Sequence, residues 1–180
     1  MPKYFSKEEN KETIRSDRTY KVVIGTNKDN KRACKLELCS PIEGETDPEE
    51  IKEHAYECSG ARYIGHWLGG MRHGLGTMQW ADGASYEGTW QCNQATQHGV
   101  FSYPNGDTYE GAWASNLMCG YGVYRHDDGT VYRGNWRFGL MHGRGEETWQ
   151  DGSQYLGRYV EGQKEGSGTF VWADGSRYLG

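Results

Sequence analysis

The residues of this chain that could do chemistry are glycines and histidines that stand close together, as in 69-GGMRHGLG-76. A glycine-rich loop can hold a phosphate through its backbone N–H groups, and a histidine can move a proton or bind a metal. The glycines here lack the G-x-G-x-x-G spacing and no GK[ST] follows them. A similar stretch also recurs every 23 residues, whereas a catalytic phosphate loop occurs once. We therefore interpret these glycines as structural.

The histidines do not form a metal site or a catalytic set. They lack the i, i+4 pairing of ligands on one helix, and those at equal repeat positions would lie about 10 Å apart, two strand spacings. The histidines of the repeated region are His66, His73, His98, His126 and His142. The five cysteines fall at unrelated positions and include no C-x-x-C pair, which predicts free thiols in a reducing cytosol. We expect no enzyme activity, no cofactor and no metal.

Composition favours short strands stabilised by aromatic side chains. Hydrophobic residues make up 35% of the 180 residues and aromatic residues 13%, and there are 27 glycines. Residues 1–35 carry ten basic against five acidic residues, whereas residues 63–180 carry eight against twelve. The aromatic residues lie mainly in this acidic part, so we expect no nucleic acid partner. No apolar run approaches the roughly 18 residues of a membrane span, and residues 1–15 lack the apolar core of a secretory signal.

An internal repeat of 23 residues is the main signal. Tyrosine begins each copy, glycine follows two residues later, and an aromatic residue comes two residues after that. The tyrosines are Tyr63, Tyr86, Tyr109, Tyr132, Tyr155 and Tyr178, and the aromatic residues are Trp67, Trp90, Trp113, Trp136 and Tyr159. With each tyrosine counted as position 1, glycine also stands at positions 14 and 21 of every complete copy, with Asp or Asn at position 20. One register over five copies predicts a repeat array.

The consensus Y-x-G-x-W-x₅-[H]-G-x-G resembles the MORN repeat (membrane occupation and recognition nexus). The resemblance covers residues 63–180, with copies at 63–85, 86–108, 109–131, 132–154 and 155–177 and a sixth cut off at 178–180, so we expect the natural protein to continue. The histidine at position 11 is replaced by Cys119 and Glu165 in two copies. In the second copy, His98-Gly99 is displaced by two places unless Gln97 simply occupies position 12, and we expect an irregular loop there.

Alternation within each copy predicts two short strands. Positions 1, 3 and 5 share one face, and positions 14, 16 and 18 alternate in the same way. A three-residue loop with glycine in the left-handed conformation would pair position 16 with the next tyrosine and position 14 with the next glycine at position 3, which keeps every aromatic residue on one face. The facing glycines then leave a trough for aromatic rings. We predict an all-β, elongated, single-layer, twisted antiparallel meander of 23-residue MORN β-hairpin repeats, with a small mixed N-terminal extension.

Residues 1–62 form that extension. It comprises the basic arm, a possible hairpin at 20–39, a short helix near 48–57 that follows the N-terminal signal Asp47-Pro48, and a half-repeat at 56–62 that leads into the array.

A continuous aromatic face predicts a partner site, because single-layer sheets expose more apolar area than a monomer normally tolerates. We expect a protein partner, either an amphipathic helix or a second array in a homodimer, in a non-enzymatic scaffold. The expected groove residues are Tyr63, Trp67, Tyr86, Trp90, Tyr109, Trp113, Tyr132 and Trp136. The resemblance implies a cytoplasmic protein of a ciliary or cytoskeletal assembly. It leaves two alternatives open, which are phospholipid association at the membrane and an accessory role in a larger enzyme such as a phosphoinositide kinase.

The acidic charge of the array argues against strong lipid binding. The residues available for contact with lipids or other anions are Arg133, Arg137, Arg144 and Arg158, and the basic arm is the other candidate.

Overall fold

The computed structural model describes residues 25–26, 32–33 and 50–180. Two short strands, β1 (Gly25–Thr26) and β2 (Arg32–Ala33), pair antiparallel within the region predicted as a hairpin. The rest of that hairpin and most of the basic arm lie outside the described residues. No helix occurs in the described part of the chain.

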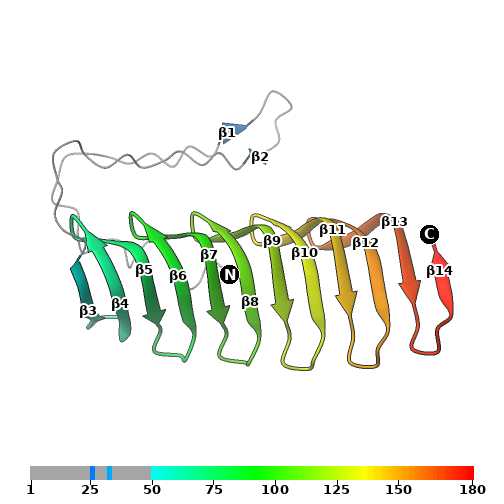
Figure 1. The fold of residues 1–180 in the computed structure, drawn as a ribbon, viewed down its shortest axis with the longest axis horizontal. Coiled ribbons are helices and arrows are strands. Elements are labelled where there is room, and N and C mark those ends of the chain that lie inside the picture. The colour runs from blue at the N-terminus through cyan, green and yellow to red at the C-terminus, as the bar shows by residue number, and fades with distance from the viewer. Residues whose placement is uncertain (1–24, 27–31, 34–49) are drawn as a thin grey trace.

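Residues 50–180 form one antiparallel sheet of 12 strands in sequence order, an open meander drawn out as a row of hairpins (Figure 1). The strands are β3 (Glu50–Tyr56), β4 (Ala61–Leu68), β5 (Met71–Gln79), β6 (Ser85–Gln91), β7 (Gln94–Ser102), β8 (Thr108–Ala114), β9 (Leu117–Arg125), β10 (Val131–Arg137), β11 (Leu140–Thr148), β12 (Gln154–Val160), β13 (Gln163–Val171) and β14 (Arg177–Leu179). The predicted all-β fold class is confirmed.

Connections between copies are the predicted three-residue loops. Met78 pairs with Tyr86 and Gly76 with Gly88, as the parity of the pattern requires. Trp80 closes the loop with Ala84, and Gly83 has a φ of 91° and donates its N–H to the Trp80 carbonyl. Glycine is favoured at this position because φ is positive.

Connections within a copy are two-residue turns in which both residues have positive φ, the type I′ geometry that suits the twist of a hairpin. They are Gly69-Gly70, Cys92-Asn93, Ser115-Asn116, Phe138-Gly139 and Glu161-Gly162. These turns follow one long edge of the sheet, and the Asp/Asn-Gly loops follow the other.

A β-bulge recurs in the second strand of every copy. Positions 10 and 14 pair with positions 5 and 3 of the first strand, so the three residues at positions 11–13 lie opposite the single residue at position 4. Position 12 has a positive φ throughout, and in the second copy it is Gln97, with a φ of 55°. The expected irregular loop in that copy is therefore wrong. Gln97 simply takes the place of glycine, and β7 keeps the register of its counterparts.

The helix predicted near 48–57 is also wrong for residues 50–56, which form β3 and pair with β4 along its length. The pairing covers the edge of the first copy, and the Lys52 carbonyl accepts a hydrogen bond from Trp67 Nε1 at 3.3 Å. A helix of this polar sequence would bury little and leave β4 unpaired. Residues 47–49, which carry the helix-start signal, lie outside the described residues.

The half-repeat before Tyr63 is visible in the turn that joins β3 to β4. Gly60 has a φ of 68°, and Ser59 Oγ accepts the N–H of Ala61 at 3.3 Å, as the side chain at position 20 does in each later copy.

Candidate functional site

The tyrosine at position 1 lies over the glycine pair of its own copy. A Cβ at Gly65 or Gly76 would overlap the Tyr63 ring or its hydroxyl, and the other four copies repeat this arrangement. The hydroxyl donates to the carbonyl at position 4, for example from Tyr109 to Ala112 at 2.9 Å. The facing glycines thus form the predicted trough, and each trough holds one tyrosine.

The aromatic residue at position 5 links neighbouring copies. Trp90 Nε1 donates to the Gly76 carbonyl and Trp113 Nε1 to the Gly99 carbonyl, both at 3.0 Å. The position-1 tyrosine of each of the first four copies stands edge-to-face between the ring at position 5 of its own copy and that of the next. The ring centroids along this ladder, from Trp67 to Tyr159, are 5.1–5.4 Å apart. The geometry adds attraction beyond area burial.

The eight predicted groove residues are these core rings, and none has more than 8% of its surface exposed. Burial raises the pKa of Tyr63, Tyr86, Tyr109 and Tyr132, which keeps their hydroxyls protonated as donors. The structure brings all eight onto one face, here called the inner face. It also buries them inside the chain, so they support a surface and do not themselves present one to a partner.

The accessible part of the inner face is a second row of rings at positions 16 and 18, here called the ring row. It comprises Trp80, Phe101, Tyr103, Tyr124, Trp149, Phe170 and Trp172. Phe101 is buried and Trp172 is 46% exposed, while the others are half-buried. Neighbouring rings are in contact from Trp80 to Tyr124 and again from Trp149 to Trp172. The sequence placed these residues on the correct face, but only burial separates them from the core rings.

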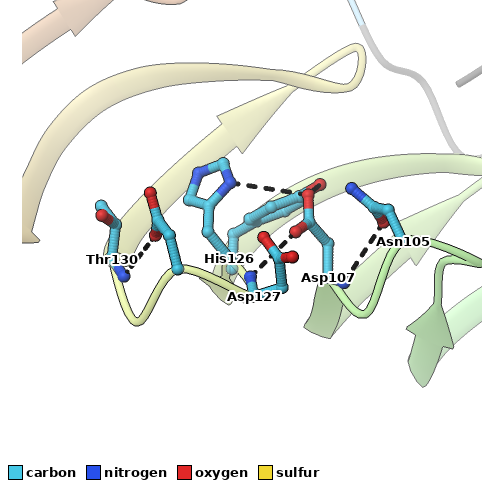
Figure 2. Close-up of polar contacts among 7 residues, drawn as sticks. Asn105, Asp107, His126, Asp127 and Thr130 are labelled. Carbon is cyan, nitrogen blue, oxygen red and sulfur yellow. Dashed lines mark hydrogen bonds and ion pairs between the residues drawn. The ribbon is translucent and has the colours of Figure 1, made fainter. Parts of the chain in front are cut away.

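A buried carboxyl group, that of Asp107, lies against Tyr124 of the ring row (Figure 2). Asp107 at position 22, where the other copies have Ala, Thr or Ser, accepts hydrogen bonds from the Tyr124 hydroxyl at 2.7 Å and the Asp127 N–H at 3.0 Å. His126 Nδ1 lies 3.5 Å from the same carboxylate. Burial opposes ionisation of Asp107, but these hydrogen bonds and the nearby His126 outweigh it and lower the pKa. Burial and then the bond to Asp107 raise the pKa of Tyr124.

A second polar group separates the two segments of the ring row. Glu147 stands at position 16, and its Oε2 accepts from the Tyr159 hydroxyl at 3.1 Å and pairs with Lys164 Nζ at 2.8 Å. The ammonium of Lys164 also lies 4.3 Å from the centroid of Trp149. The C-terminal half of the inner face is therefore more polar than the N-terminal half.

The first copy holds a buried guanidinium that sequence reasoning missed. Arg72 at position 10 is 4% exposed, lies 4.5 Å from the centroid of Trp90, and donates to the Asn93 carbonyl at 3.1 Å. Later copies have Ala95, Met118, Met141 and Lys164 at this position.

Carboxylates line the edge of the sheet beside the ring row. The side chain at position 20 accepts the N–H of position 22 in every copy, at 2.8–3.2 Å. Hydrogen bonds to this turn lower the pKa of Asp128, Asp151 and Asp174. We call the exposed set the acidic edge, and it comprises Asp82, Asp127, Asp128, Asp151 and Asp174.

Three of the four predicted arginines lie on neighbouring strands of one face, and the fourth lies apart from them. Arg133, Arg144 and Arg158 are exposed on the outer face, opposite the core rings, whereas Arg137 is half-buried at the two-residue turn, 5.4 Å from the centroid of Phe138. At the N-terminal end of the outer face, a shallow depression has glycines in its floor and Ile51, Leu75 and Val100 in its walls.

In residues 25–26, 32–33 and 50–180, no three His, Cys, Asp or Glu side chains are placed to hold a metal ion together. Over the same ranges, no helix is long and apolar enough to cross a bilayer.

Comparison with known proteins identifies the repeat. The family model described as MORN repeat matches residues 63–85, 86–108, 109–131, 132–154 and 155–177. No curated protein matches the chain. Similar solved structures include the G-box domain of the microcephaly protein CPAP, with 12% identity, a TM-score of 0.38, and coverage of 70% of this chain and 71% of that one.

A second similar structure is the TCP domain of SAS-4 (dCPAP) of Drosophila melanogaster, in complex with a proline-rich motif of Ana2 (dSTIL). Its identity is 12% and its TM-score 0.41, with coverage of 81% of this chain and 97% of that one. Likenesses at this level do not carry a function from either protein to this chain.

Proposed function

Because the chain belongs to the MORN repeat family, we propose that it is a non-enzymatic adaptor that binds a protein partner along the ring row of its inner face. The observation that carries this proposal is the half-exposure of most of the ring row, whose two segments together span the five copies and lie on rings that are themselves buried. An extended apolar strip of this kind is typical of interaction surfaces. Rigid aromatic rings also lose little conformational entropy when they bind.

An amphipathic helix is the partner that fits this strip. One copy advances the sheet by two strand spacings, about 9.4–9.8 Å. Seven residues of an α-helix advance about 10.5 Å, so a heptad of the partner nearly matches a copy of the array. Apolar side chains of such a helix would repeat in phase with the rings at position 18.

The acidic edge determines which charge the partner helix should carry on its polar side. Its carboxylates follow the ring row on one side only, whereas Glu161 is the one acidic residue in the two-residue turns on the other side. Lys or Arg repeated every seven residues would face these carboxylates while the apolar positions face the rings. A second array would bring one acidic edge close to another or leave both unpaired, so a homodimer through the inner face is the less favoured occupant.

The proposal can be tested with a synthetic helix that has leucine at the apolar heptad positions and one lysine per heptad. A peptide of equal composition with a scrambled order is the control. Tyr103→Ser in the ring row should abolish or strongly weaken binding, measured by tryptophan fluorescence or calorimetry. The matched variant Tyr121→Ser, on the outer face, should leave binding unchanged. Equal binding of the scrambled peptide, or an equal loss in both variants, would refute the proposal.

We place this adaptor in a cytoplasmic, cytoskeletal or ciliary assembly, on the basis of the family resemblance. Phospholipid association is less favoured, because the outer face that carries the exposed arginines also carries Glu87, Glu110 and Glu146. An accessory role in a larger enzyme would use the same ring row and is compatible with the adaptor proposal.

A further inference from the structure

Two arginines face each other on the outer face, far from the ring row. Arg144 of β11 and Arg158 of β12 are direct cross-strand partners, and both are exposed. Residues opposite each other in antiparallel strands have Cβ atoms about 4.5–5.5 Å apart, and like charges at such a pair are destabilising. The sheet therefore holds the bases of two positively charged side chains next to each other.

Neither charge is paired with a carboxylate of residues 50–180, since the side chains of Arg144 and Arg158 have no ion pair or hydrogen bond to one. Other arginines on the same face do have one, since Arg62 pairs with Glu53 and Arg125 lies 3.6 Å from Glu110.

A third arginine stands nearby on the same face. Arg133 of β10 is exposed and pairs in register with Glu146 of β11, two residues along the strand from Arg144. Glu165 stands in the bulge of β13 opposite Arg158. Three guanidiniums against the carboxylates of Glu146 and Glu165 still leave an excess of positive charge in an array whose net charge is negative.

The repeat does not need arginine at this cross-strand pair. The equivalent cross-strand pairs in the other copies are Leu75 with Thr89, His98 with Ala112, and Tyr121 with Asn135. These pairs are neutral or carry one histidine, and the sheet continues through all of them. The arginine pair is thus a local addition to a fold that forms without it.

We propose that Arg144 and Arg158, assisted by Arg133, bind a phosphate monoester carried by a protein segment that crosses the outer face. A guanidinium is a planar donor that fits the oxygens of phosphate, and a dianion matches the charge of the two facing arginines better than one carboxylate does. Tyr121 and Leu156, each 61% exposed, flank the site and offer apolar contacts to neighbouring side chains of the segment. This site lies opposite the ring row and does not depend on the proposed function.

A protein segment suits the surroundings better than a membrane does. Glu87 and Glu110 are exposed on the same face as the arginines, together with the half-buried Glu146. A flat anionic bilayer laid on this face would meet these carboxylates as well as the arginines. A narrow chain can place its phosphate on the arginine pair alone.

The test uses phenyl phosphate and a short leucine-flanked phosphoserine peptide as probes. Binding is followed by the NMR signals of the arginine Nε–H groups at low ionic strength. We expect saturable shifts at Arg144 and Arg158, and affinity that falls about tenfold in Arg144→Gln and in Arg158→Gln. Arg177→Gln, which removes one exposed positive charge elsewhere, is the matched control and should bind as the natural chain does.

Three outcomes would overturn the proposal. The first is that neither probe produces saturable shifts. The second is an equal loss of affinity in Arg177→Gln, which would show unspecific attraction. The third is binding to phosphatidylcholine vesicles containing phosphatidylinositol bisphosphate that requires both arginines and exceeds binding of the phosphopeptide, which would assign the site to a lipid headgroup. Each variant's NMR spectrum also reports whether the sheet is intact.

Discussion

Gly122→Ala should destabilise the array because it forces a core tyrosine from its place. The three atoms nearest to a Cβ at Gly122 all belong to the Tyr109 ring and hydroxyl, and they lie closer than real contacts allow. Tyr109 is 0% exposed, and its ring stands between Trp113 and Trp136. Displacing it therefore disturbs two copies.

The magnitude follows from the buried ring. A buried aromatic side chain covers about 150–250 Å², and at about 25 cal/mol per Å² its full exposure costs about 4–6 kcal/mol. The displaced ring would regain part of this contact, so we expect a loss of about 3–5 kcal/mol in the free energy of unfolding. Repeat arrays need not unfold in one step, so urea unfolding followed by tryptophan fluorescence is combined with hydrogen exchange of the amides of β8–β10.

Two comparisons isolate the cause. Gly152→Ala introduces a Cβ with no atom within 4 Å, at a φ of 86°, and should cost only about 1–2 kcal/mol of backbone strain. In a Tyr109→Ala background the clash is absent, so Gly122→Ala should change stability by less than about 1 kcal/mol. The reasoning is refuted if Gly122→Ala costs no more than Gly152→Ala, or costs the same in both backgrounds.

Three further predictions concern single side chains. Gln97→Gly should stabilise the array by about 1 kcal/mol in urea unfolding, because Gln97 has a φ of 55° where the other copies have glycine, whereas Gln97→Ala should not. Arg158→Glu should stabilise it by about 0.5–1 kcal/mol at low salt by replacing a like-charged cross-strand pair with an opposite-charged one, and an effect that persists in high salt would contradict this cause. The pKa of Asp107 is lowered from 3.8 in the folded chain, so its ionised form contributes stability above that value, and this contribution is lost as pH falls through the lower folded pKa. Asp107→Asn should therefore lose less stability between neutral pH and strongly acid pH than the natural chain, and equal acid loss in both would contradict this role.

The pairing register of the strands was predictable because it depends on spacings of a few residues that recur in every copy. Alternation at positions 14, 16 and 18 and glycine at position 21 predicted the three-residue loop, and Met78 pairs with Tyr86 as expected. The turns at positions 7 and 8 gave a weaker pattern, since their residues range from Gly69-Gly70 to Cys92-Asn93. Positive φ is shared by these turns, but residue type is not.

Long-range pairing overrode one local signal. Asp47-Pro48 favours a helix start when it is considered alone. The first copy, however, leaves β4 with an unpaired edge and the Trp67 indole N–H without an acceptor. Pairing with β3 satisfies both, and this gain involves residues that a local pattern does not relate.

Residue spacing was enough to predict the repeat, its two strands, the loop that joins the copies and the face that carries the aromatic side chains. These follow from residue spacing, because a strand alternates every two residues whatever surrounds it. How deeply each aromatic side chain is buried, and which rings it contacts, followed only from the packing of several strands in three dimensions. The glycine pair leaves room for the Tyr109 ring between its aromatic neighbours. The predicted groove residues therefore lie in the core, whereas Tyr103 and Trp149 remain partly exposed. The pairing of Arg144 with Arg158 continues the unshifted register of β11 and β12, whereas only the three-dimensional structure shows that both side chains are exposed. Burial depends on several strands at once, and no single stretch of residues contains that information.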